Sequence, residues 1–423
     1  MTETALLVGL KLTARPRKGR AADAEPITPE ESIEELAALA ATAGAVVAER
    51  QIQARYRIDA ATFVGSGKVE ELKSQIHFHD ATVVIFDREL SPTQQRNLEN
   101  ALEVKILDRT QLILDIFARR ARTREGQLQV ELAQLNYMLP RLTGKGAAMS
   151  RLGAGIGTRG PGETKLETDR RRIHQRIQAI GRDLERVRGG RATQRRQRQA
   201  VPLATIALVG YTNAGKSTLF NRLTGAAVIA DARMFATLDP TVRHIRLPSR
   251  RQVLLSDTVG FIRNLPTTLV QAFRATLEEV VEAELLLHVV DASSPAVAGH
   301  TAHVLATLAE IGAGSTPLIT VFNKADLLTG ETTLPADAVA ISARTGQGLD
   351  ALLARMDREL ALDPVSDCVF RIPASEGAPL HLLHQYGRVT STRYDGDICE
   401  VAASVPASLR RRLEEYVVRS EEE

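Results

Sequence analysis

One stretch of eight residues, Gly210 to Ser217 (GYTNAGKS), constrains the fold of this chain more than any other feature. The short apolar run from Ile206 to Val209 precedes it and predicts a buried strand, and a helical pattern begins at Thr218. A glycine-rich loop between a strand and a helix is typical of a phosphate-binding P-loop. In such a loop, backbone N–H groups and the helix N-terminus surround a polyphosphate. We therefore expect Lys216 to contact the β- and γ-phosphates and the Ser217 hydroxyl to hold Mg²⁺.

The pattern of strands and helices divides the 423 residues into four parts. Strands and helices alternate over residues 1–110, which predicts an α/β subdomain. Residues 111–200 are expected to form a basic helical hairpin with a glycine-rich tip, followed by a linker. Residues 201–362 are expected to form a doubly wound α/β domain around the P-loop, and 363–423 a small α+β domain. The predicted fold class is therefore α/β, with a doubly wound P-loop sheet between these neighbours.

Composition excludes several classes of protein. No apolar run approaches the roughly 20 residues that a membrane-spanning helix needs, and the N-terminus lacks a charged-then-apolar export signal. The two cysteines, Cys368 and Cys399, have neither metal-site nor disulfide spacing. We expect a monomer in the cytoplasm, without an integral membrane segment.

Two segments carry apolar residues at alternating spacings of three and four. The first contains Leu128, Leu132, Leu135, Leu139 and Leu142, and the second contains Leu166, Ile173, Ile177, Ile180, Leu184 and Val187. Helices with such apolar faces, close in sequence, are expected to pack as an antiparallel pair.

The connection between these helices is basic. From Arg141 to Ala200 the chain has sixteen Arg and Lys residues against five Asp and Glu, although the whole chain carries only +3. Thr143 to Gly162 is rich in glycine and contains no acidic residue. A positive, projecting tip favours RNA binding, which would depend strongly on salt; a disordered linker is the alternative. The candidate RNA contacts are Lys145, Arg151, Arg159, Arg170, Arg171 and Arg172, supported by Arg176.

Two later loops favour guanine as the base. Asn323-Lys324-Ala325-Asp326 follows the apolar run from Leu318 to Phe322. The Asp326 carboxylate can accept hydrogen bonds from both N1–H and the exocyclic amine of guanine, a pairing that adenine cannot make. Ser342-Ala343-Arg344 follows the next predicted strand and would bring a backbone N–H to the guanine O6.

Two further loops suit Mg²⁺ and the γ-phosphate. Asp257-Thr258-Val259-Gly260 ends a predicted strand, so that Asp257 suits a water-bridged contact to Mg²⁺ and the Gly260 N–H a contact to the γ-phosphate. Phe235-Ala236-Thr237-Leu238-Asp239 lies earlier in the chain. Thr237 would complete the metal shell only while the γ-phosphate is present, which would order this loop in the triphosphate state.

Four sequence blocks together resemble the HflX family of translational GTPases. They are Phe235 to Pro240, Asp257 to Phe261, Asp108 to Ala118, and Gly155 to Arg172. The resemblance implies a cytoplasmic GTPase that binds the large ribosomal subunit and splits stalled or idle 70S ribosomes under stress. It also implies that the helical pair approaches the RNA of the peptidyl-transferase region.

The family's nucleotide residues map onto five groups in this chain. They are Gly210, Tyr211, Thr212, Asn213, Ala214, Gly215, Lys216 and Ser217; Phe235, Ala236, Thr237, Leu238 and Asp239; Asp257, Thr258, Val259 and Gly260; Asn323, Lys324, Ala325 and Asp326; and Ser342, Ala343 and Arg344. The resemblance implies Mg²⁺ on Ser217 and Thr237. Lys216, Thr237 and Gly260 are the candidate catalytic residues. Asn213 resembles the asparagine of GTPases that bind K⁺, so K⁺ is a candidate second cofactor.

Phe261 occupies the position where many small GTPases carry the glutamine that orients the attacking water. A phenyl ring cannot hydrogen-bond water in this way. We therefore expect slow hydrolysis by the free protein and stimulation by the ribosome.

Several alternatives stay open. The chain could instead be a GTPase of large-subunit assembly, or a metabolic phosphotransferase, although Asn323 to Asp326 argues against adenine in the site. Gly65-Ser66-Gly67-Lys68 could let the N-terminal subdomain bind a second nucleotide such as ATP, but its spacing favours a plain turn. The C-terminal domain has no motif of its own, and the resemblance implies only ribosome contact for it.

Overall fold

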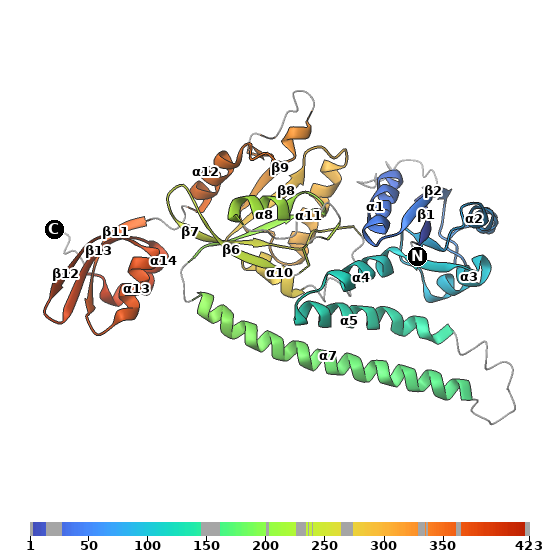
Figure 1. Ribbon diagram of the computed structural model, residues 1–423, viewed down its shortest axis with the longest axis horizontal. Coiled ribbons are helices and arrows are strands. Elements are labelled where there is room, and N and C mark those ends of the chain that lie inside the picture. The colour runs from blue at the N-terminus through green and yellow to red at the C-terminus, as the bar shows by residue number, and fades with distance from the viewer. Residues whose placement is uncertain are drawn as a thin grey trace, which may run out of the picture.

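The computed structural model describes residues 3–13, 28–144, 161–199, 203–225, 234–235, 237–238, 240–263, 274–328, 335, 337–360 and 365–418. These residues form three β-sheets, which follow one another along the chain, and a pair of long helices (Figure 1).

The N-terminal sheet has four parallel strands in the order β2-β1-β3-β4. Its elements are β1 (Thr4–Leu12), α1 (Pro29–Thr42), β2 (Val46–Arg55), α2 (Ser66–Phe78), β3 (Val83–Phe86), α3 (Pro92–Leu102), β4 (Lys105–Asp108) and α4 (Arg109–Arg120). Capping boxes start two helices: Thr28 exchanges hydrogen bonds with Glu31, and Ser91 with Gln94. Proline at the first helical position supports both starts, because its missing N–H would have no partner there.

Helices α5 (Arg124–Met138) and α7 (Pro161–Gln199) form the predicted pair, with the 3₁₀ turn η1 (Leu139–Gly144) following α5 (Figure 1). Leu128, Ile180 and Leu184 are buried between the helices, and Leu132 and Leu135 pack against this cluster. The alternating spacing places these side chains on one face of each helix. The prediction of a helical pair is confirmed.

The central sheet has six strands in the order β10-β9-β8-β5-β7-β6. Its strands are β5 (Thr205–Gly210), β6 (Thr241–Arg246), β7 (Gln252–Asp257), β8 (Leu285–Asp291), β9 (Leu318–Asn323) and β10 (Val339–Ala340). Its helices are α8 (Lys216–Thr224), α10 (Arg274–Val281), α11 (Val297–Glu310), the 3₁₀ turn η2 (Ala325–Leu327) and α12 (Leu349–Glu359). All strand pairs are parallel except β6 with β7. The P-loop fold is confirmed, and β6 is an edge strand that the sequence analysis missed.

The C-terminal sheet is antiparallel, in the order β11-β13-β12. Its elements are β11 (Val365–Pro373), α13 (Gly377–Tyr386), β12 (Arg388–Asp395), β13 (Ile398–Pro406), α14 (Ala407–Arg412) and the 3₁₀ turn η4 (Glu414–Tyr416). Phe370, Leu383 and Val401 belong to its own buried cluster, so this α+β part has a separate core.

The cores of the N-terminal and central parts are continuous. Leu7, Ile113 and Phe117 belong to the same cluster of buried side chains as Val259 and Phe261. Burial of apolar surface between the two parts therefore holds α1 and α4 beside the loops that follow β5 and β7. Among the described residues, no helix has both the length and the apolar character needed to cross a membrane.

Candidate nucleotide site

The P-loop has the expected geometry at the carboxyl end of β5. Gly215 has φ +93°, and a side chain added there would overlap the Asn323 amide, so that only glycine fits. The Lys216 Nζ lies inside the loop and donates to the carbonyl oxygens of Gly210 (3.0 Å) and Tyr211 (2.8 Å). Lys216 is therefore held in place before any phosphate arrives.

Burial of Lys216 destabilises the charged form of its side chain. Burial lowers the pKa of Lys216 to about 8, and the nearby Asp257 carboxylate opposes the shift. Removing an ammonium group from water disfavours its charged form. A polyphosphate in the loop would supply the negative charge that this lysine lacks.

Three oxygen-bearing side chains meet beside Lys216. Ser217 Oγ lies 2.7 Å from Thr237 Oγ1, and both hydroxyls donate to Asp257 Oδ2 at 2.7 Å. Asp257 Oδ1 is buried and has no hydrogen-bond partner among the described residues. Burial raises the pKa of Asp257, while these hydroxyls oppose the rise.

This donor set fits Mg²⁺, which binds hard oxygen ligands. Ser217 and Thr237 would hold the ion, and Asp257 would hold its water shell. Bound Mg²⁺ supplies neutralisation of charge on the phosphates. The described residues contain no cluster of three His, Cys, Asp or Glu side chains that could form another metal centre.

The loop after β7 closes the phosphate end of the site. Thr258 Oγ1 donates to the Leu208 carbonyl at 2.5 Å and so ties this loop to β5. A Cβ added at Gly260 would lie only 2.9 Å from Lys216 Nζ. Glycine thus leaves open the space in front of Lys216, where a γ-phosphate would lie.

One side chain joins the two loops that are predicted to bind the base. Asn323 donates from Nδ2 to the Ala214 carbonyl (2.8 Å) and accepts at Oδ1 from the Ala343 N–H (2.9 Å). Lys324, with φ +65°, pairs with Asp291 at 2.5 Å. Asp326 is exposed at the end of this loop. The structure therefore brings the P-loop and both predicted base loops together at the carboxyl edge of the sheet.

The predicted RNA contacts are only partly described. Arg170, Arg171 and Arg172 are exposed on α7. Arg176, which supports this set, is also exposed, and its Nε lies 2.6 Å from Glu131 Oε1 of α5. Lys145, Arg151 and Arg159 lie outside the described residues, as do Ala236 and Asp239 of the nucleotide set.

The short glycine motif of the N-terminal part starts α2. Gly65 is the residue before the helix, and Lys68 Nζ pairs with Glu71 at 2.7 Å. This arrangement resembles an ordinary helix start, because Lys68 is already bound to a neighbouring carboxylate.

A buried network that no sequence motif indicated joins the P-loop to the N-terminal part. Tyr211 donates its hydroxyl proton to Glu35 at 2.5 Å, and Glu35 pairs with Arg109 at 2.7 Å. Arg109 is 1% exposed and also pairs with Asp87 at 3.0 Å. We call Glu35, Asp87, Arg109 and Tyr211 the interdomain network. Burial, followed by the Glu35 charge, raises the pKa of Tyr211.

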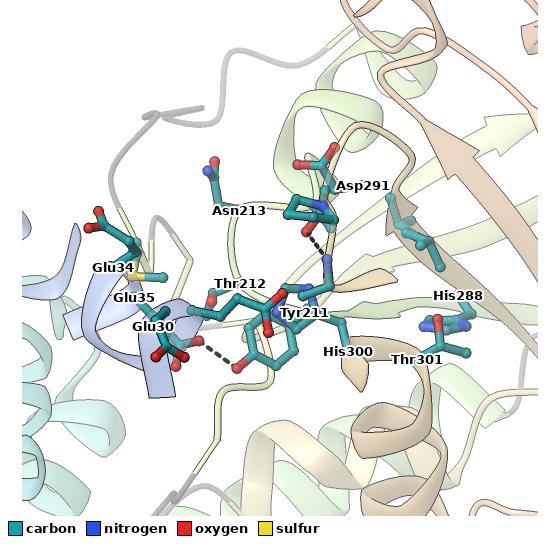
Figure 2. A pocket seen from close by; sticks show the side chains of 18 residues that line it. Glu30, Glu34, Glu35, Tyr211, Thr212, Asn213, His288, Asp291, His300 and Thr301 are labelled. Carbon is teal, nitrogen blue, oxygen red and sulfur yellow. Dashed lines mark hydrogen bonds between the residues drawn. The ribbon is translucent and has the colours of Figure 1, made fainter. Parts of the chain in front are cut away.

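The interdomain network borders a cavity of about 440 Å³ between α1, the P-loop and α11 (Figure 2). Tyr211 stacks on His300 at 3.8 Å between ring centroids. Figure 2 shows Glu35 pointing at Tyr211 from α1, with Asn213 at the opposite rim. The P-loop is therefore in contact with two different elements outside the nucleotide site.

Three family models match the chain. A model described as GTP-binding GTPase N-terminal matches residues 30–118, one described as GTP-binding GTPase Middle Region matches 120–198, and one described as 50S ribosome-binding GTPase matches 205–324. A solved structure of a GTP-binding protein from Sulfolobus solfataricus in complex with GDP is 24% identical, with a TM-score of 0.45; the match covers 86% of this chain and 99% of that one.

Whole-length relatives are more similar. GTPase HflX of Caldanaerobacter subterraneus subsp. tengcongensis is 49% identical over 92% of this chain and 91% of its own length. GTPase HflX of Escherichia coli (strain K12) is 45% identical over 82% of this chain and 83% of its own length. Identity at this level over nearly the whole length of both proteins means that the chain belongs to the HflX family of GTPases.

Proposed function

We propose that this GTPase binds the large ribosomal subunit in the cytoplasm and uses the GTP state to separate stalled or idle 70S ribosomes under stress. The observation that carries the proposal is the direct contact between the nucleotide loops and the part of the chain that leads into the helical pair. Tyr211 of the P-loop is bonded to Glu35 of α1, and Arg109 begins α4, which leads into α5.

The loop that contains Thr237 is in contact with the same helices. The Met234 N–H donates to Thr42 Oγ1 of α1 at 3.2 Å. The ring centroids of Phe235 and of Phe117 in α4 are 4.5 Å apart. Thr237 would change partners when Mg²⁺ and the γ-phosphate arrive. Because Met234 and Phe235 are so near, that change would be passed to α1 and α4, and from there to the helical pair.

The exposed arginines of α7 suit an RNA partner. The side chains of Arg170 to Arg172 are exposed on α7, and another face of this helix is buried against α5. The ribosome-binding description of the family model over residues 205–324 agrees with a large-subunit partner. Phosphate contacts of this kind would weaken steeply as salt rises.

Hydrolysis by the free chain is proposed to be slow. Phe261 is 3% exposed and belongs to the shared core, so it cannot orient water. We propose that large subunits accelerate hydrolysis by ordering the loops around the γ-phosphate. Asn213 is exposed, with φ +62°, and we propose K⁺ as a second cofactor at this residue. Equal rates of GTP hydrolysis in Na⁺ and in K⁺ would contradict this.

Sedimentation of intact 70S ribosomes with the purified chain tests the proposal. We expect separated subunits with GTP and with a non-hydrolysable analogue, but intact 70S particles with GDP. Replacing Arg170, Arg171 and Arg172 by alanine should weaken binding to large subunits, whereas the exposed Arg57→Ala serves as a control. Intact 70S particles in every nucleotide state, together with binding to immature large subunits, would instead favour the assembly function.

A further inference from the structure

Thr212 of the P-loop has a buried hydroxyl with no partner. The residue is 6% exposed, and its Oγ1 makes no hydrogen bond with any described residue. Its backbone N–H donates to the Phe261 carbonyl at 2.8 Å. A buried hydroxyl without a partner destabilises the folded state by about 1–3 kcal/mol. Such a group is expected to find a partner when the site is filled.

The position of Thr212 indicates what that partner is. A Cβ built on Gly260 would lie 2.9 Å from Lys216 Nζ and 2.9 Å from both Cα and Cγ2 of Thr212. Lys216 and the Gly260 N–H are the groups with which a P-loop GTPase contacts the γ-phosphate. The methyl group of Thr212 therefore borders the same small space. Its hydroxyl is attached to the same Cβ, so that a change of χ1 rotamer would bring the hydroxyl to this space.

The attacking water needs a polar group in this space, and Phe261 does not supply one. A threonine hydroxyl can both donate and accept. We infer that the Thr212 hydroxyl hydrogen-bonds the attacking water and orients it toward the γ-phosphorus, the task that glutamine performs in other GTPases. The water oxygen bonds to the γ-phosphorus, and the bond to the β–γ bridging oxygen breaks with its electron pair leaving on GDP. A water proton ends on the released phosphate, so Thr212 is not consumed.

The test is single-turnover hydrolysis of Mg²⁺–GTP by the free, full-length chain, which does not depend on any ribosome function. Thr212→Val keeps the shape of the side chain but removes the hydroxyl, and should slow hydrolysis about 100-fold. Thr212→Ser keeps the hydroxyl and should rescue most of that loss. The exposed Thr392→Val makes the same chemical change in the C-terminal domain and serves as the matched control.

Equilibrium binding separates this role from two others. Orientation of water predicts that Thr212→Val changes the affinities for GDP and for a non-hydrolysable GTP analogue by less than about twofold, since neither complex reacts. Unchanged hydrolysis in Thr212→Val, or equal losses in the Val and Ser variants, overturns the inference. A weaker analogue affinity with normal GDP affinity would also overturn it, because the hydroxyl would then bind the phosphate itself. So would a parallel loss of both affinities and of melting temperature, which would indicate a packing role.

Discussion

The two ends of the nucleotide site differ in how far the protein satisfies its own polar groups. At the base end, both polar atoms of the Asn323 amide are hydrogen-bonded, and Lys324 is paired with Asp291. At the phosphate end, Thr212 Oγ1 and Asp257 Oδ1 are buried without partners among the described residues. The hydroxyls of Ser217 and Thr237 share a single carboxylate oxygen there.

This difference separates recognition from switching. A site whose polar groups are already bonded changes little on binding, so we expect it to discriminate by rejecting bases that would leave Asp326 unpaired. A site with unpartnered buried groups is completed only by its ligand, so its structure depends on whether the γ-phosphate is present. Each prediction below alters one end, or the network beside it, and measures nucleotide binding, hydrolysis or stability.

The largest effect is expected at the base end. Asp326→Asn replaces an acceptor pair with one acceptor and one donor, so the affinity for GTP should fall about 1,000-fold while xanthosine triphosphate binds more tightly. The xanthine base carries a carbonyl where guanine carries its amine, and the asparagine amide can donate to it. Fluorescence titration with both nucleotides measures the change, and the exposed Asp395→Asn is the control. Equal losses for both nucleotides would mean that Asp326 does not contact the base.

At the phosphate end, a smaller and more selective effect is expected. Thr237→Ala removes a hydroxyl that would engage Mg²⁺ only in the triphosphate state, so hydrolysis should fall about 100-fold. The affinity for GDP should change less than about twofold, because GDP lacks the γ-phosphate. Ser217→Ala should weaken both GDP and GTP in the presence of Mg²⁺. Single-turnover rates and equilibrium titrations distinguish the variants; an equal loss of GDP affinity in both would contradict a state-dependent Thr237.

The fold was largely predictable because its signals are local. Apolar runs, the P-loop and the spacing of leucines each lie within a few turns of chain, and all three are confirmed. Strand β6 was missed for the same reason: its sequence, TVRHIR, has only one buried residue, Ile245. An edge strand that pairs on one side needs little apolar surface, so no alternation reveals it. Its position is fixed by pairing with β7, which the sequence does not display.

The meeting of the P-loop and the two predicted base loops at one edge of the sheet could be predicted from the sequence. The contacts between side chains far apart in the sequence could not. Glu35 and Arg109 are 74 residues apart, and Glu35 and Tyr211 are 176 apart, so no spacing rule joins them. Arg109 does lie in the block from Asp108 to Ala118 that resembles the family. Arg176 and Glu131 pair across the two packed helices, a contact that no spacing within either helix indicates.

The interdomain network allows the phosphate end to be altered from outside the site. Glu35→Gln removes the charge opposite buried Arg109 and should lower the free energy of unfolding by about 2–3 kcal/mol. Tyr211→Phe should lower the free energy of unfolding by about 1 kcal/mol. Because the two side chains touch, the double variant should be less destabilised than the sum of the singles. Denaturant titration measures these values.

The same variants sharpen the comparison between the two ends. The Tyr211 hydroxyl is bonded to Glu35 and not to the loop that contains Asp326. Glu35→Gln should therefore alter the ratio of GTP to GDP affinity without changing the preference for guanine over adenine. An altered base preference would mean that the base end is not as rigid as its hydrogen bonds indicate. Strictly additive stabilities would mean that the 2.5 Å bond between Tyr211 and Glu35 contributes nothing.

The smallest effect is a pH dependence confined to the phosphate end. Lys216 has a pKa of about 8 in the nucleotide-free protein because it is buried. It must be charged to bind phosphate, so the affinity for GTP should fall about fivefold between pH 8 and pH 9, and by nearly tenfold for each further pH unit. The unfolded chain keeps the proton up to about pH 10.4. Between these values the unfolded state binds more protons, and the contribution of Lys216 to the free energy of unfolding should rise with pH.

Lys216→Arg is the control that isolates this group. Arginine stays charged throughout the range, so its weaker binding of GTP should lose the additional pH dependence due to Lys216. Deprotonation of the guanine base is common to both proteins and cancels in the comparison. The opposite signs are the strongest part of the test, because rising pH should stabilise the empty protein while it weakens the complex. If GTP affinity and the free energy of unfolding both fall above pH 8, Lys216 is not the group that titrates. The phosphate end would then not contain a destabilised, charged Lys216 before GTP binds.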